Sequence, residues 1–75
     1  MELVIGDIIA VPERNMLLEI TNLYDKGGVY ARELTGIYYY SYFIDTRHIK
    51  AIKMTEIYNT EAGKTLLEAK YDSSM

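Results

Sequence analysis

The sequence predicts a small all-β domain of five short antiparallel strands with a short C-terminal α-helix. Three observations predict this fold class. Short segments rich in branched and aromatic residues recur along the chain, and Gly, Pro, Asn and Asp separate them, as is typical of strands joined by tight turns. After residue 58 helical spacing replaces this pattern. We therefore assign residues 1–58 to the strands and residues 59–75 to a short helix and tail, within one domain.

The first two strands are expected at residues 8–11 and 16–23. A bend at Gly6 and Asp7 precedes the first strand, since Gly adopts dihedrals that other residues resist and Asp accepts backbone hydrogen bonds in turns. Pro12 begins the turn between the two strands. In the second strand the apolar alternation slips near Asn22, which indicates a β-bulge.

The remaining elements follow a pair of glycines, a strong hairpin signal. We expect a third strand at residues 29–34, in which Val29 and Ala31 suit a core and Tyr30 lies opposite, and a fourth strand within residues 36–45. Asp45 can cap a single helical turn before a last strand at residues 49–54. In the C-terminal helix Ala62, Leu66 and Ala69 recur at helical spacing.

The fourth strand contains four of the eight tyrosines within residues 38–42, and both of its faces are apolar. One face consists mainly of tyrosines, whose hydroxyls favour contact with water. The other face contains Ile and Phe, which are more often fully buried. We assign to the core Ile37, Tyr39, Ser41 and Phe43. That assignment leaves Tyr38, Tyr40 and Tyr42 outside. A core this small needs only one such face, so the other face is the main functional clue in the sequence.

Composition excludes several kinds of chemistry. The chain has no cysteine, which rules out disulfides and zinc-thiolate sites and fits a reducing compartment. His48 is the only histidine, and no spacing of carboxylates predicts a metal site, so we expect neither a cofactor nor an enzyme. No apolar run has the roughly 20 residues of a membrane span, which favours a cytoplasmic protein without membrane contact.

The strand pattern resembles a small Src-homology-3-like barrel over about residues 3–54. The resemblance depends on the apolar-Gly-Asp-apolar opening at residues 5–9 and on the one-turn helix predicted at residues 45–49. It implies a five-stranded antiparallel barrel, a fold that serves peptide binding, nucleic-acid binding and subunit assembly alike. A compact chain of short apolar strands without catalytic motifs also resembles the small accessory proteins of phages and mobile elements.

The leading functional hypothesis is a non-enzymatic protein-interaction module. Tyr38, Tyr40 and Tyr42 would contact a second copy, a larger protein that the chain inhibits or regulates, or both, because Tyr combines a large apolar ring with a polar tip. Acidic strand residues such as Glu19 and Glu33 would attract a basic partner.

The alternative hypothesis is nucleic-acid or nucleotide binding. Arg47, Lys50 and Lys53 form the one local concentration of positive charge and follow the tyrosine strand directly. Cations of this kind hold phosphates while tyrosine rings stack on bases. The net charge of −3 argues against non-specific binding to nucleic acid.

Overall fold

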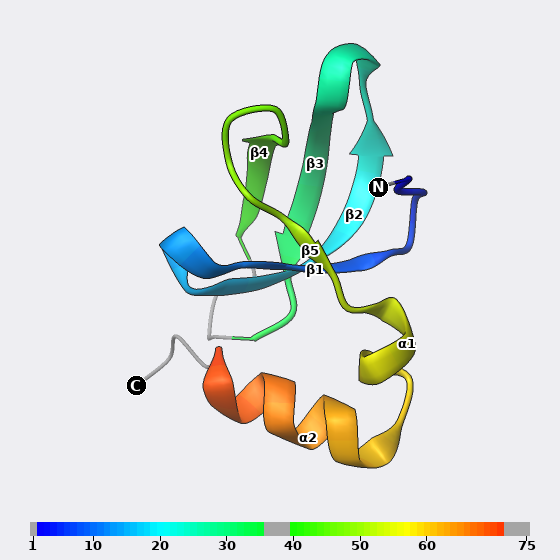
Figure 1. Cartoon of the computed structure of the whole chain (residues 1–75), viewed down its shortest axis with the longest axis vertical. Helices are drawn as coiled ribbons and strands as arrows, with labels where there is room; N and C mark the ends of the chain where they lie inside the picture. Colours follow the sequence, from blue (N-terminus) through cyan, green and yellow to red (C-terminus); the bar gives the residue numbers. More distant parts are fainter. Residues whose placement is uncertain (1, 36–39, 72–75) are drawn as a thin grey trace.

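The computed structural model describes residues 2–35 and 40–71 and shows one antiparallel sheet with two short helices after it (Figure 1). The elements run in the order β1 (Ile8–Val11), the 3₁₀ turn η1 (Pro12–Arg14), β2 (Met16–Leu23), the 3₁₀ turn η2 (Asp25–Gly27), β3 (Gly28–Glu33), β4 (Ser41–Asp45), β5 (Ile52–Lys53), α1 (Thr55–Tyr58) and α2 (Glu61–Lys70). This arrangement confirms the predicted fold class.

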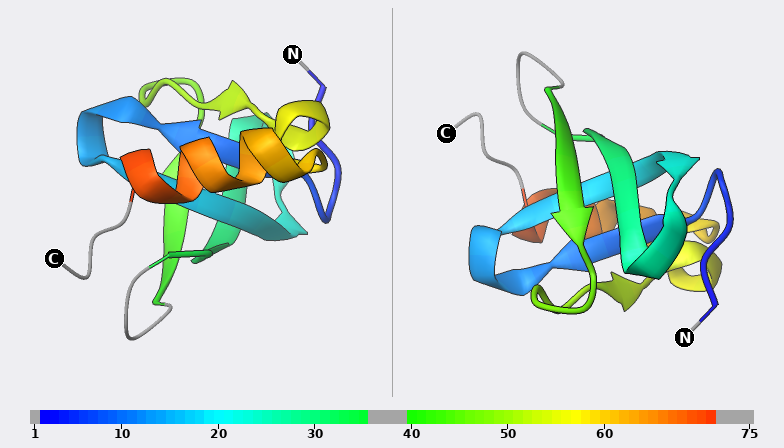
Figure 2. Two further views of the ribbon diagram at one scale, coloured as in Figure 1. Left: turned by 90° about the horizontal axis from the view of Figure 1, so that it is seen from below. Right: turned by 90° about the horizontal axis from the view of Figure 1, so that it is seen from above.

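The five strands lie in the order β4-β3-β2-β1-β5, and all neighbours are antiparallel. The sheet curls strongly, so that β4 crosses over β1 when the molecule is seen from above (Figure 2). The predicted closure into a barrel is not found, because the two end strands β4 and β5 do not pair within the described part of the chain. A five-stranded antiparallel sheet in a domain this small remains compatible with a Src-homology-3-like fold.

The first half of the chain follows the predicted elements closely. The first two strands occupy residues 8–11 and 16–23 as expected. The turn between them ends at Asn15, whose φ of 51° is one that Asn tolerates well. The register of β2 against β3 shifts between Ile20 and Asn22, which confirms the bulge.

The second half differs at the last strand. Asp45 caps the turn between β4 and β5 as predicted, since its Oδ1 accepts a hydrogen bond from Arg47 N at 3.0 Å. The predicted strand over residues 49–54 is wrong in length, because only Ile52–Lys53 pairs with β1. The chain before it is held by the turn, where Ile49 N donates to the carbonyl oxygen of Asp45 at 2.9 Å.

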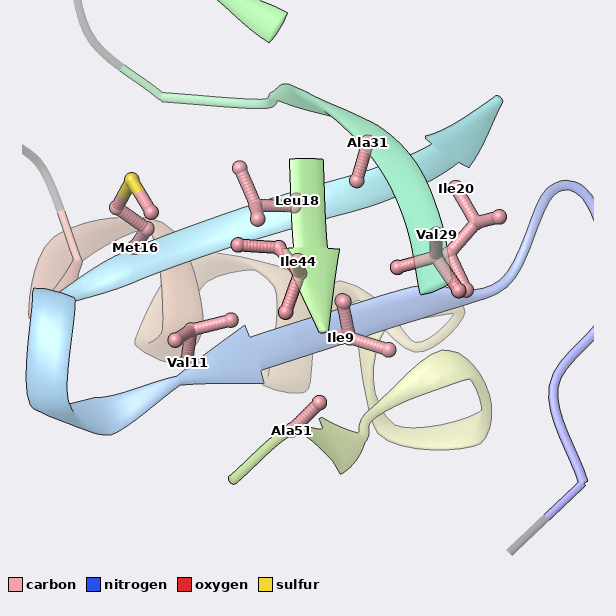
Figure 3. Packing of buried hydrophobic residues seen from close by; sticks show 9 residues of the cluster. All are labelled: Ile9, Val11, Met16, Leu18, Ile20, Val29, Ala31, Ile44 and Ala51. Carbon is pink, nitrogen blue, oxygen red and sulfur yellow. The ribbon is translucent and has the colours of Figure 1, made fainter. Parts of the chain in front are cut away.

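The main core lies inside the curl of the sheet (Figure 3). Its buried members come from four strands and from the segment just before β5: Ile9, Val11, Met16, Leu18, Ile20, Val29, Ala31, Ile44 and Ala51. The side chain of Ile44 on β4 reaches over β1 toward Ile9 (Figure 3). Contacts between these strands therefore close the inner core although no ladder joins β4 to β5.

A second cluster lies on the outer face of the sheet, where α2 packs across β1 and β2 (Figure 2). Its buried members are Ile8, Ala10, Leu17, Leu67 and Tyr71. The helix is confirmed, but its predicted apolar face is wrong, because Leu66 is 71% exposed and the buried helical positions are Gly63 and Leu67. None of the described helices has the length and apolar character needed to cross a membrane.

Gly63 allows α2 to approach α1 closely. A Cβ atom at this position would collide with the carbonyl oxygen of Ile57 and lie 2.7 Å from its Cγ2. Thr60 caps the helix by accepting a hydrogen bond from Gly63 N at 3.0 Å. The hydroxyl of Tyr58 donates to Glu68 at 2.9 Å, and burial together with this hydrogen bond raises the pKa of Tyr58 to about 12. The two helices therefore form one rigid corner.

Asp7 connects the start of β1 to this corner. Its buried carboxylate accepts hydrogen bonds from Val4 N at 2.9 Å and from the hydroxyl of Thr55 at 2.7 Å, and the same hydroxyl accepts from Ile8 N. The backbone hydrogen bond from Val4, followed by that from Thr55, lowers the pKa of Asp7. The predicted bend before β1 is therefore also the anchor of α1.

Replacing Gly63 with Ala tests the helix contact. An exposed Gly→Ala change in a helix usually adds about 1 kcal/mol of stability. Here overpacking against Ile57 costs about 1–3 kcal/mol and pushes Leu67 away from the sheet, so we expect a net loss of about 1 kcal/mol and a melting temperature lower by about 4–8 °C. Thr65→Ala, at an exposed position of the same helix, should not destabilise the protein. A Gly63→Ala variant as stable as wild type would contradict the close approach.

Candidate protein-binding surface

The two faces of β4 are assigned the opposite way from the prediction. Ile44 is 0% exposed and Tyr42 packs half-buried against the inner core, whereas Phe43 is 49% exposed and Ser41 is exposed. The predicted core face with Ser41 and Phe43 is therefore wrong. The other predicted members of the two faces, residues 37–39, lie outside the described residues.

Pairing with β3 explains the reversal. Residues directly opposite each other in an antiparallel pair project to the same face of the sheet. Val29 lies opposite Ile44 and Ala31 lies opposite Tyr42, so the two core residues of β3 fix the core face of β4. Tyr30 lies opposite Phe43 and shares the outer face with it.

Three aromatic rings gather on this outer face, and we call Tyr24, Tyr30 and Phe43 the aromatic patch. Tyr24 and Tyr30 have ring centroids 5.8 Å apart, Tyr30 and Phe43 5.5 Å, and Tyr24 and Phe43 6.2 Å. Their steeply inclined rings have the edge-to-face geometry that aromatic pairs prefer. The side chains remain 53%, 41% and 49% exposed, so the rings contact one another without being buried.

Gly28 provides the platform for the patch. A Cβ atom at this position would lie 2.7 Å from Cζ of Phe43, so any other residue would displace the ring. Beside the platform is a shallow pocket of about 200 Å³. Its lining includes Tyr24 of the patch: Leu3, Leu23, Tyr24, Gly27, Gly28, Val29 and Thr46. In this lining Val29 belongs to the inner core and Leu3 packs against it, so Tyr24 is the one ring of the patch that borders the pocket.

The outer face of the sheet is thus divided into two parts. Helix α2 covers the outer face over β1 and the beginning of β2. Leu34, just after β3, packs against the cluster of buried residues beneath this helix. Over β3 and β4 the patch is followed by an ion pair, in which Arg32 lies 3.1 Å from Glu19. An apolar centre with a charged margin is the usual composition of a protein-binding surface.

Part of this patch is predictable from the sequence. The alternation of the third strand predicts that Tyr30 lies opposite its core face, and the paired glycines predict the hairpin turn. What was missing was the hairpin register, which places Phe43 beside Tyr30. Tyr24, which directly precedes the turn η2, joins the patch because the turn brings it next to Gly28 and Tyr30.

Two of the three tyrosines predicted to bind a partner can be placed. Tyr40 is 56% exposed, and its ring lies 6.5 Å from that of Tyr42 at the rim of the inner core. The hydroxyl of Tyr42 donates to the buried carboxylate of Glu33 at 3.1 Å, and burial, followed by this hydrogen bond, raises the pKa of Tyr42. Tyr38 lies outside the described residues. Glu33 is therefore a core hydrogen-bond acceptor and not a surface charge.

The predicted phosphate-binding cations are mostly engaged with carboxylates. Arg47 contacts Asp45 through Nε at 3.1 Å and through NH2 at 2.9 Å, and this pair holds the pKa of Asp45 at about 2. Lys53 lies 3.5 Å from Oδ2 of Asp7, while Lys50 is exposed. These three cations do not form a continuous basic surface.

His48 is exposed and lies 3.9 Å from Oδ2 of Asp45. Among the residues that the structure describes, no three metal-ligating side chains come together. A pocket of about 280 Å³ is lined by Lys53, Thr55, Glu56 and Ile57. Lys53 and Thr55 are already bonded to Asp7, so this pocket is part of the structural corner.

An NMR titration tests the engagement of Arg47. We expect the Asp45 carboxyl carbon to titrate with a pKa of about 2, and Arg47→Ala to raise that pKa toward 3.8. Because the folded pKa lies below the unfolded one, the pair stabilises the fold above about pH 4, and this contribution disappears as the pH falls toward 2. Lys50→Ala should leave the pKa of Asp45 unchanged. A wild-type pKa near 3.8 would show that Arg47 is available for phosphate.

Comparisons of the chain with protein-family models, with curated proteins and with solved structures find no significant match. The case for a function therefore depends on the geometry of the aromatic patch and its surroundings.

Proposed function

We propose that this chain is a non-enzymatic protein-interaction module that binds its partner through the aromatic patch. One observation carries the proposal: three mutually contacting rings, each 41–53% exposed, occupy the part of the outer face that α2 does not cover. Small proteins seldom expose contiguous apolar surface that has no binding role.

The chemistry of the patch suits protein recognition. Tyrosine rings lose little side-chain entropy on binding and offer a hydroxyl for a hydrogen bond, which explains their frequency at binding hot spots. The ring contacts and the Gly28 platform hold the patch in place before binding, so less conformational freedom is lost when the partner arrives.

The partner is a protein that the chain inhibits or regulates, a second copy of the chain, or both. The resemblance to accessory proteins of phages and mobile elements supports a regulatory role, and the absence of cysteine supports a reducing compartment such as the cytoplasm. We take the fold to be an open relative of the Src-homology-3-like barrel, whose peptide-binding members also use surface aromatics. Tyr40 and Tyr38 remain candidates for an extension of the surface.

Nucleic-acid or nucleotide binding is the less supported alternative. It would need phosphate-binding cations near exposed rings, but Arg47 and Lys53 already pair with Asp45 and Asp7. Lys50 is the one remaining cation of the three predicted.

Replacing Tyr30 and Phe43 together with Ser tests the proposed surface. Partners captured from the cells that make the chain would be identified, purified and titrated calorimetrically against each variant. We expect the double variant to keep its fold and to bind at least about 30-fold more weakly, which corresponds to about 2 kcal/mol, the usual size of a hot-spot effect.

Leu66→Ser is the matched control, since this apolar side chain is 71% exposed on α2 and lies outside the patch. It should change the affinity much less than the double variant. Equal binding by the double variant and wild type would rule the patch out. A shift of a labelled single-stranded oligonucleotide that disappears with added salt and with Lys50→Ala would instead favour the alternative.

A further inference from the structure

The strand at one end of the sheet, β4, has an edge that no other described strand pairs with. Two hydrogen bonds at its ends fix which backbone groups face β3: Glu33 N donates to Tyr40 O at 2.8 Å, and Thr46 N donates to Gly27 O at 2.9 Å. Because antiparallel ladders alternate, the intervening even-numbered residues also face β3. The backbone groups of Ser41, Phe43 and Asp45 therefore point away from the sheet.

The two end strands differ in how readily their free edges can pair with a strand of another molecule. The strand β5 has only two residues, one of which is Lys53, and short length and lysine both discourage edge pairing. The strand Ser41–Asp45 has no lysine, proline or glycine and consists mainly of residues that favour strands. Such an edge is a template for a further strand.

We propose that β4 pairs antiparallel with β4 of a second copy, so that Phe43 lies opposite Phe43 and Ser41 lies opposite Asp45. The inference deepens the proposed function by naming the partner at this edge, and it rests on that function. Phe43 N–H would donate to the Phe43 carbonyl oxygen of the other copy, and Asp45 N–H to the Ser41 carbonyl oxygen, in both directions. The Asp45 carbonyl oxygen already accepts from His48 N and Ile49 N.

A second copy fits this edge in one register. All outward groups lie on alternate residues centred on Phe43, so a two-fold axis at this residue matches Phe43 with Phe43 and Asp45 N–H with the Ser41 carbonyl oxygen. Of these outward groups only the Ser41 N–H lacks an acceptor across the axis, because the Asp45 carbonyl oxygen is engaged in its own turn. Pairing in any other register that keeps the outward groups aligned would leave part of the strand without a neighbour. The two sheets would then form one continuous sheet.

The side chains are also compatible with this pairing. Phe43 faces outward in each copy, and directly opposite residues have Cβ atoms about 5 Å apart, so the two aromatic patches would join across the axis. On the same face, Asp45 of one copy would lie next to Ser41 of the other and one strand from its Arg32. No like charges lie directly opposite each other.

The register predicts opposite effects for two charges at Ser41. Within one copy Ser41 lies opposite Arg32, so Ser41→Glu should not destabilise the fold, whereas Ser41→Arg places two like charges side by side and should lower the melting temperature slightly. Across the axis the same change places a negative charge opposite Asp45, whereas Ser41→Arg places a positive charge there. We expect sedimentation velocity over a concentration series to show a monomer–dimer equilibrium, about fivefold weaker for Ser41→Glu and tighter for Ser41→Arg, since each charge acts twice in a two-fold dimer.

Two further measurements test the register. Added salt should bring the dissociation constants of the two charge variants closer together. The amide of Phe43 in the wild-type protein should exchange with solvent more slowly as the protein concentration rises, whereas the amide of Tyr42, which already faces β3, should change much less. Phe43→Cys should form a disulfide-linked dimer faster than Tyr30→Cys, because the chain has no other cysteine and only position 43 lies on the axis.

A protein that remains monomeric at all concentrations, or a dimer indifferent to both Ser41 charges, would overturn the inference. If the monomeric chain still binds another protein through Tyr30 and Phe43, the proposed function stands and the second copy is excluded. If Ser41→Glu weakens binding of that other protein, its own strand occupies the β4 edge. If neither self-association nor partner binding depends on the patch, the proposed function fails as well.

Discussion

The packing of Ile44 against the inner face of β1 is the constraint on which the rest of the structure depends. Because Ile44 lies over Ile9 and near Ala51, the sheet must curl until its two end strands approach each other (Figure 3). A flat sheet of this size would leave both faces in water, and one helix could not cover them. The curl gives the chain an inner core without a second layer, as the small size of the domain requires.

Curling leaves the outer face to be covered by the ten residues of α2, and they cover only part of it. The helix packs on β1 and β2, where Gly63 lets it turn sharply after α1, and burial of Leu67 and Tyr71 stabilises it there. A helix of this length is marginal alone, so the cluster beneath it is the reason that it forms. The aromatic patch occupies the remaining area because no other described element reaches it.

Local sequence signals were sufficient for most of the fold. Turn chemistry at Gly6, Pro12 and the paired glycines located the first three strands, and helical spacing from Ala62 onward located the helix. The shortness of β5 could not be predicted, because it depends on how few residues find partners on β1, which is set by tertiary pairing. The buried face of α2 was missed because a glycine at a packing position leaves no apolar signal in the sequence.

The candidate site shows the same division between local and tertiary information. That β4 has one apolar face too many could be read from its residues, but which face is buried depends on pairing with Val29 and Ala31. Burial frequencies of Phe and Tyr favoured the wrong face, because packing against β3 outweighs residue preference. Tyr24 belongs to the surface only through the fold of a turn, which no periodicity reveals.

The contact between Gly28 and Phe43 links two positions far apart in the sequence. A larger residue at position 28 fits only if the ring at position 43 shrinks or moves, so the shape of the outer surface depends on this glycine. A mutation that removed this contact without unfolding the sheet would disrupt the aromatic patch first and leave the inner core intact.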